Sequence, residues 1–180
     1  MRLVAVGLSH HRAGVGLRGR VALGEPDARC LLQNLVLAGA REAVVLSTCN
    51  RTEIYLAGPD AANLAALAVH ELSELVGVDP RELEPVLYRL TDATAALHLN
   101  RVAAGLDSLV PGEGEVLGQV RRALALAEDE GTAGHVLSRA FQRALETGKR
   151  ARTETGIAVG NASVASVSYE MFPDELHWWQ

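Results

Sequence analysis

The stretch VVLSTCNRTEIYLAG, residues 44–58, contains two strand-like runs joined by a short polar segment. The first run, 44–46, is β-branched or apolar, and the second, 52–56, contains threonine, isoleucine, tyrosine and leucine before Gly58. Such residues favour strands, whereas glycine commonly ends them. The pattern predicts a β-hairpin with Cys49 at its polar tip.

The segments on either side of this hairpin predict a small α+β domain. A strand is expected at 2–8, a helix at about 26–37, an amphipathic helix at 60–77 and a short strand at 84–90. This gives the order β-α-β-β-α-β with the helices covering one face of the sheet. That order is typical of a ferredoxin-like sandwich.

The chain becomes helical from residue 91 onward. Asp92 is expected to cap a helix that ends at the PGEGE segment, 111–115, and two further helices should follow, with a fourth beginning at 163–172. The apolar stripes of the first three helices comprise Leu99, Val102, Ala103 and Leu106, then Leu117, Val120 and Leu124, then Leu137, Phe141, Ala144 and Leu145.

The composition is that of an ordinary soluble chain. Its 180 residues carry a net charge of −5, and no apolar run approaches the roughly 18 residues that span a bilayer. There is no signal-peptide pattern, so we expect a cytoplasmic protein without membrane contact. Two cysteines, Cys30 and Cys49, do not form a disulfide framework.

Positive residues are concentrated late in the chain. They include Arg121, Arg122, Lys149, Arg150 and Arg152. Two interpretations are open at this point: a solvated helix face, or a surface that binds the phosphates of a nucleic acid.

Cys49 is the strongest candidate for chemistry. The thiolate is the nucleophilic form of cysteine, and a nearby cation such as Arg51 favours that form. The alternative interpretation is that Cys49 has no catalytic role and only occupies the hairpin tip. His98 lies at the edge of a helical apolar stripe, where a structural role and a functional one are both open. Adjacent His10 and His11 are a poor metal pair, so no metal site is expected.

Four segments together resemble one known family. STCNRTEIY at 47–55 resembles the active-site segment of glutamyl-tRNA reductase, which starts tetrapyrrole (porphyrin) synthesis from glutamate. VGLSHHRAGVGLRGRV at 6–21, HLNRVAAGLDSLVPGEGEVLGQVRRAL at 98–124 and FQRALETGKRARTETGI at 141–157 are similar to other blocks of that family, in the same order. The sequence is therefore identified as a member, with a catalytic domain at 1–155 (an α/β part at about 1–90 and a helical part at about 91–155). Residues 156–180 would be the beginning of a long linker helix.

The resemblance implies an oxidoreductase mechanism with a cysteine nucleophile. Cys49 would attack the ester of Glu-tRNA to form a thioester, NADPH would reduce that thioester to glutamate-1-semialdehyde, and His98 would assist the thiol or the leaving ribose oxygen. Substrate-binding roles are implied for Thr48, Arg51, Ser108, Glu113, Glu115 and Gln119. The late basic residues become candidates for contacts with the tRNA backbone.

The family protein is more than twice as long, with a nicotinamide-binding domain and a dimerisation domain that this sequence lacks. The chain has no G-x-G-x-x-G after a strand, so we expect no cofactor bound by the chain itself, and a monomer. It also has Arg12 where the family usually has threonine, and Glu115 where it usually has glutamine.

Three functions are compatible with this sequence. The first is a glutamyl-tRNA reductase catalytic domain that needs a separate reductase to supply hydride. The second is a stand-alone paralogue that passes the aminoacyl group from Cys49 to another acyl acceptor or to water. The third is a non-catalytic tRNA-binding module.

Overall fold

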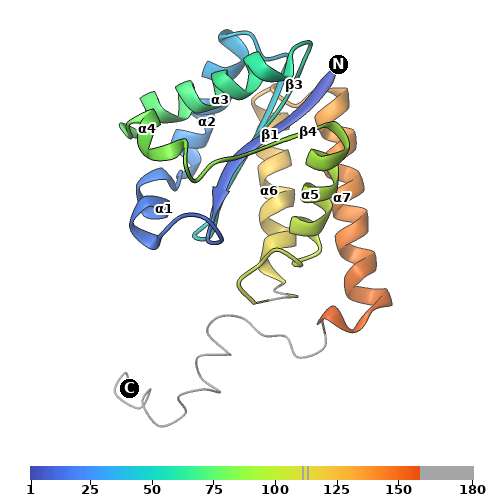
Figure 1. Cartoon of the computed structure of the whole chain (residues 1–180). Helices are drawn as coiled ribbons and strands as arrows, with labels where there is room; N and C mark the ends of the chain where they lie inside the picture. The colour runs from blue at the N-terminus through green and yellow to red at the C-terminus, as the bar shows by residue number, and fades with distance from the viewer. Residues whose placement is uncertain (111, 113, 159–180) are drawn as a thin grey trace.

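Four antiparallel strands form one sheet in the order β2-β3-β1-β4 (Figure 1). The structure is a computed structural model and describes residues 1–110, 112 and 114–158. Its elements are β1 (Arg2–Ser9), α1 (Val15–Val21), α2 (Glu25–Leu37), β2 (Glu42–Ser47), β3 (Arg51–Gly58), α3 (Ala61–Val76), α4 (Pro80–Leu83), β4 (Tyr88–Thr91), α5 (Asp92–Ala103), α6 (Glu115–Asp129), α7 (His135–Glu154) and a 3-10 turn at Gly156–Ala158.

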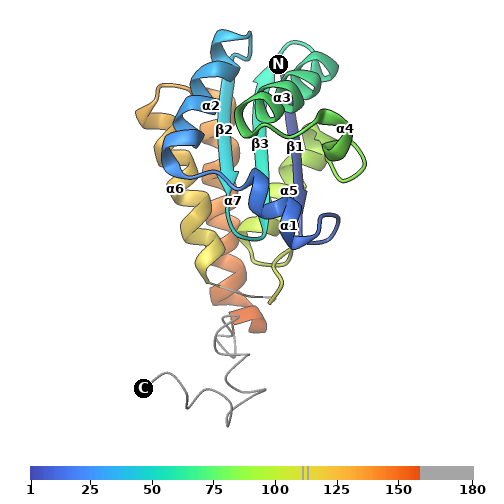
Figure 2. The same cartoon turned by 90° about the vertical axis from the view of Figure 1, so that its left-hand side faces the viewer.

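Helices cover both faces of the sheet. Helices α2 and α3 pack on one face, and α5, α6 and α7 pack on the other, as Figures 1 and 2 show from two directions. Every residue of β3 is buried as a result. A strand buried on both faces cannot keep the apolar-polar alternation of a half-exposed strand, so polar residues of β3 must find partners inside the protein.

Local sequence signals set the ends of the longer helices. The Asp60 carboxylate accepts hydrogen bonds from the amides of Ala62 and Asn63 at the beginning of α3. Gly77, with φ of 63°, ends the same helix in the left-handed conformation that glycine adopts without strain. The predicted helix at 60–77 is therefore confirmed.

The loop before α7 fastens this helix to the edge strand β2. The Ala43 amide donates to the Thr132 carbonyl over 2.9 Å, and the Thr132 hydroxyl donates to the Ala43 carbonyl over 3.0 Å. The buried Glu42 carboxylate accepts from the amides of Val136 and Leu137 at 3.1 and 2.7 Å. Glu42 thus satisfies free N–H groups at the N-terminus of α7.

Glu42→Ala is expected to lower the free energy of unfolding by about 1–3 kcal/mol, because a buried amide and a part-buried amide lose their acceptor. Urea unfolding followed by circular dichroism measures this loss. Glu74→Ala, at an exposed position of α3, is the control and should change the value by less than about 0.5 kcal/mol. Equal effects of the two substitutions would contradict the proposed capping role.

The sequence predicted most elements correctly, but three details were wrong. Thr91, not Asp92, is the N-cap of α5, because the Asp92 carboxylate instead accepts from the Leu3 amide and pairs with Arg2 at the start of β1. Leu106 lies beyond the end of α5 and is exposed, since the chain turns away at Gly105 with φ of 74°. The sequence predicted helices over one face of the sheet, but α5, α6 and α7 also cover the other face.

Two short helices, α1 and α4, were not predicted, because four to seven residues hold too little periodicity to identify a helix. The predicted fourth helix at 163–172 lies outside the described residues. Within the described part of the chain, no helix combines the length and apolar character required to cross a membrane.

Candidate active site

Cys49 is exposed at the tip of the β2–β3 hairpin, as the sequence predicted. Thr48 closes this tip: its amide donates to the Arg51 carbonyl over 2.8 Å, and its hydroxyl accepts from the amides of Asn50 and Arg51. The Arg18 guanidinium donates to the Cys49 carbonyl over 3.4 Å. The tip is therefore held by a local hydrogen-bond network, while its cysteine faces solvent.

A small pocket of about 30 Å³ adjoins the tip. Cys49 and Thr48 line one side of it, and Ser108, Glu115 and Gln119 line the other. The Gln119 amide donates to the Glu115 carboxylate over 3.2 Å on consecutive turns of α6. Chain segments about 60 residues apart thus bring these predicted site residues together.

Arg51 is buried and bonded to two carboxylates of the protein. Its Nη1 lies 2.8 Å from Glu53 Oε1 and 2.9 Å from Asp107 Oδ2, and Nη2 donates to the Asp107 carbonyl. Only 2% of its side chain is exposed, against 15% for Asp107. The positive charge of Arg51 is therefore balanced by Glu53 and Asp107. The cation that contacts the backbone of Cys49 is Arg18.

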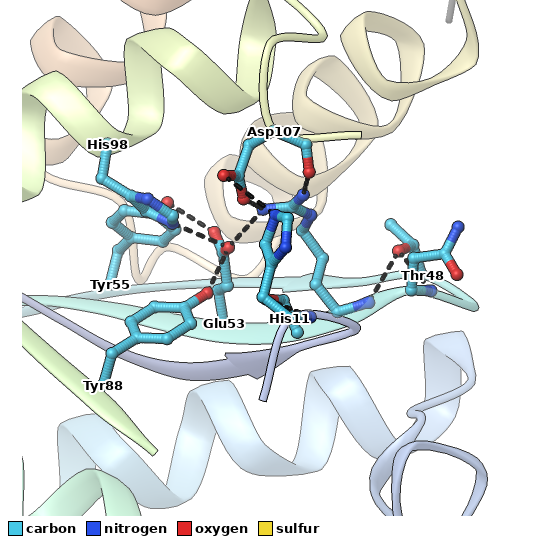
Figure 3. Close-up of polar contacts among 10 residues, drawn as sticks. His11, Thr48, Glu53, Tyr55, Tyr88, His98 and Asp107 are labelled. Atoms are coloured by element: carbon cyan, nitrogen blue, oxygen red, sulfur yellow. Dashed lines mark hydrogen bonds and ion pairs between the residues drawn. The ribbon is translucent and has the colours of Figure 1, made fainter. Parts of the chain in front are cut away.

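Glu53 is the centre of a buried polar cluster, shown in Figure 3. Its carboxylate is 2.9 Å from His98 Nε2 and accepts from the hydroxyls of Tyr55 and Tyr88 at 2.6 and 2.5 Å, besides its contact with Arg51. Alternation along β3 directs residues 51, 53 and 55 to the same face of the sheet, toward α5 and α7. We call Glu53, Arg51, Tyr55, Tyr88 and His98 the Glu53 cluster.

The Glu53 cluster holds its carboxylate in the charged form. Burial alone would raise the pKa of Glu53, but the hydrogen bond from His98 and the charge of Arg51 outweigh burial and lower it to about 2. The pKa of the Tyr88 hydroxyl is raised by burial and by the Glu53 charge, so this group stays protonated and donates. Gly7 is the cross-strand neighbour of Glu53 and leaves room for the Glu53 side chain. Any other residue at position 7 would place its Cβ only 2.9 Å from Glu53 Cγ.

His98 contacts Glu53 and not the pocket at Cys49. Its ring also packs edge-on against Tyr88, with the centroids 5.1 Å apart. In Figure 3, Thr48 beside the tip and His98 lie at opposite ends of the group of side chains. The structure therefore separates the two residues for which the resemblance implied catalytic roles.

The predicted cationic residues lie on α6 and α7, and two of them contact other groups of the protein. Arg121, Arg122 and Lys149 are exposed on α6 and α7. Arg150 is paired with Glu154, and Arg152 donates to the Gly112 carbonyl over 3.1 Å beside the pocket-forming loop. Glu113 lies outside the described residues.

Sequence reasoning missed Glu53, Asp107, Tyr88 and Arg18. One signal was available for Glu53: an acid two residues from Arg51 and two from Tyr55 in a strand shares their face. No comparable signal existed for Asp107, Tyr88 or Arg18, because their places depend on how distant segments pack.

Fold and site together define a mixed α/β domain that presents an exposed cysteine beside a polar pocket and a buried charged cluster. The family model described as "Glutamyl-tRNAGlu reductase, N-terminal domain" matches residues 6–155. The chain belongs to this family, as the sequence resemblance indicated.

Individual relatives agree with the family match. The chain is 44% identical over 172 residues to glutamyl-tRNA reductase of Marinobacter nauticus and 45% identical over 175 residues to that of Rubrobacter xylanophilus; each match covers 95% of this chain and 40% of the relative. The solved structure of glutamyl-tRNA reductase from Methanopyrus kandleri matches with a TM-score of 0.73 and 33% identity, over 94% of this chain and 39% of that one. The chain thus spans about 40% of the length of these proteins.

Proposed function

We propose that this chain is a catalytic domain of glutamyl-tRNA reductase type, which takes the glutamyl group from Glu-tRNA onto Cys49. The Cys49 sulfur bonds to the ester carbonyl carbon, the carbon–oxygen bond to the tRNA ribose breaks, and the ribose oxygen leaves with a proton. The observation that carries the proposal is the exposed Cys49 beside the pocket of Ser108, Glu115 and Gln119. The names of the relatives support the choice of substrate.

Reduction needs a hydride that the described residues do not supply. In the family-type reaction NADPH provides it and releases glutamate-1-semialdehyde, and tetrapyrrole synthesis is the corresponding pathway. The sequence has no glycine-rich dinucleotide motif after a strand, so its residues do not fit this cofactor. We therefore assign hydride supply to a partner chain or domain and derive no step on this chain from it.

The pocket residues suit an aminoacyl group. The Glu115 carboxylate would attract the α-ammonium group, which every aminoacyl ester carries. Arg51 would bind the substrate carboxylate in place of Asp107, which is the more exposed of its two partners. Its ion pair with Glu53 would remain. Thr48 and Ser108 would position the ester.

We propose that His98 acts through Glu53 and not on the Cys49 thiol. Its hydrogen bond orients the carboxylate that holds Arg51, so His98 is a positioning residue in this proposal. Transfer or hydrolysis without reduction is not proposed, because none of the described contacts favours it.

The tRNA backbone would contact the exposed cations Arg121, Arg122 and Lys149, with Arg150 and Arg152 nearby on α7. Contacts of this kind release counterions, so the affinity should fall as the salt concentration rises.

We also propose the ferredoxin-like class for the α/β part, at about 1–90, within a catalytic unit at 1–155. The strand order β2-β3-β1-β4, antiparallel pairing and the order β-α-β-β-α-β support this class, if α1 and α4 are treated as additions.

Intact-protein mass spectrometry of the purified chain mixed with Glu-tRNA tests the function. We expect a glutamyl adduct on the chain that hydroxylamine removes, and we expect it to persist without any nicotinamide. Other charged tRNAs are the specificity control. A folded chain that forms no adduct with any charged tRNA would contradict the proposal.

A further inference from the structure

A second cavity lies at the edge of the sheet, and the proposed chemistry does not use it. Its volume is about 380 Å³, and it is formed by β2 with α2 and α6, which both lie beside this edge strand in Figure 2. This volume falls in the range of about 300–1,000 Å³ that is usual for small-molecule sites. We call it the edge cavity; its lining includes Leu23, Val45, Ser47, Gln119, Arg122 and Leu126.

The edge cavity lies next to the pocket at Cys49. Gln119 lines both, and Ser47 of the edge cavity directly precedes Thr48 of the pocket. Two residues span at most about 7 Å, so Ser47, the last residue of β2, lies close to Cys49. A group attached to an acyl carbon at Cys49 therefore lies a short distance from the edge cavity.

The backbone of β2 offers hydrogen bonds toward this cavity. Both the amide and the carbonyl of Ala43 point away from β3, since they bond to Thr132. In an antiparallel ladder this direction repeats every second residue, so the N–H and C=O of Val45 also point outward. The loop at Thr132 covers the edge at Ala43, whereas at Val45 the strand borders the edge cavity.

The side chains around this edge favour a neutral, flat group over a run of phosphates. Leu23, Leu126 and Val45 supply apolar contact, while Glu25 and Asp129 add negative charge. The Arg29 guanidinium is already bonded to Glu25 and Glu130. Arg122 remains as an exposed cation at the rim. Its Nη1 would lie 3.5 Å from a Cβ atom at Gly118, so the guanidinium is directed toward the end of α6 that lines the pocket at Cys49.

We propose that the edge cavity binds the 3′-terminal adenosine of the charged tRNA, an inference that rests on the proposed function. The amino acid of a charged tRNA is esterified to the ribose of this adenosine, so the base must lie next to the acyl site. Adenine presents an amino donor beside a ring-nitrogen acceptor, which match the carbonyl and amide of Val45. Arg122 is placed for the phosphate that precedes this nucleoside.

Binding of the trinucleotide CCA tests the edge cavity without any acyl chemistry. In ¹⁵N-labelled chain, CCA should shift the Val45 amide resonance. CCI, whose terminal inosine replaces the amino donor by a carbonyl, should bind about tenfold more weakly or worse. CCA that does not bind, that leaves Val45 unshifted, or that binds no better than CCI would overturn the proposal.

Ala125→Phe fills the edge cavity from an exposed position of α6, so the core is not disturbed. It should weaken CCA binding about tenfold or more. Ala66→Phe, at an exposed position of α3 on the other face of the sheet, is the matched control and should bind CCA like the parent. Equal binding by the two variants would overturn the assignment.

Acylation of Cys49 separates this proposal from the proposed function. Ala125→Phe should slow acylation by Glu-tRNA about tenfold, but it should not slow acylation by glutamate α-thiobenzyl ester, which has no nucleoside. If the parent reacts with both donors and Ala125→Phe slows neither, the edge-cavity proposal fails and the function stands. If the parent reacts with neither donor, the proposed function is contradicted. The CCA binding experiment then still tests whether the edge cavity binds adenosine.

Discussion

Cys49→Ser is expected to abolish the glutamyl adduct, with acylation by Glu-tRNA slowed at least about 10³-fold. A serine hydroxyl is not ionised at neutral pH, and His98, the base that the resemblance implied, contacts Glu53 instead. The exposed position of residue 49 also means that the substitution removes no packing. The rate of adduct formation, measured by intact-protein mass spectrometry, gives the size of the effect.

Cys30→Ser is the matched control for this experiment. Cys30 is the other cysteine of the chain, is also exposed, and lies on α2 away from the hairpin tip. Its replacement should leave the rate and the hydroxylamine sensitivity of the adduct unchanged. An adduct that survives Cys49→Ser, or that disappears with Cys30→Ser, would show that Cys49 is not the nucleophile.

Glu53→Gln is expected to lower the free energy of unfolding at pH 7 by about 3–5 kcal/mol, as when one member of a buried ion pair is removed. The Arg51 guanidinium would lose the fully buried half of its counter-charge. The imidazole of His98 and the hydroxyls of Tyr55 and Tyr88 would then face an amide instead of a carboxylate. Urea unfolding measures the difference, and Glu74→Gln on the surface of α3 should cost less than about 0.5 kcal/mol.

The same substitution should change the pH dependence of stability. The pKa of Glu53 is lowered in the folded protein from 4.5 to about 2, so its contribution is fully present above pH 4.5. That contribution is lost as the pH falls from 4.5 toward 2, because the unfolded chain binds the proton first. The stability gap between parent and Glu53→Gln should therefore narrow between pH 4.5 and pH 3, and a gap that stays constant would contradict the charged state assigned to Glu53.

The chain's own sequence determined its hairpin, its cysteine tip and most of its helices. These features follow from local chemistry: β-branched runs at 44–46 and 52–56, polar residues between them, and capping signals such as Asp60 and Gly77. It also carried enough family-specific motifs to identify the family, which the match over 6–155 confirmed. Such signals act within a few residues, so one sequence is sufficient to recognise them.

Only the tertiary structure decided what surrounds Arg51, where His98 points and where a cavity borders the sheet edge. Asp107 and Tyr88 reach the buried end of β3 from segments about 55 and 35 residues away, and no local pattern records that approach. The pairing of Arg51 follows from burial on both faces of the sheet, since a charge without water needs a partner inside the protein. The edge cavity likewise depends on distant segments: Thr132 covers β2 at Ala43, while α2 and α6 leave a cavity beside Val45.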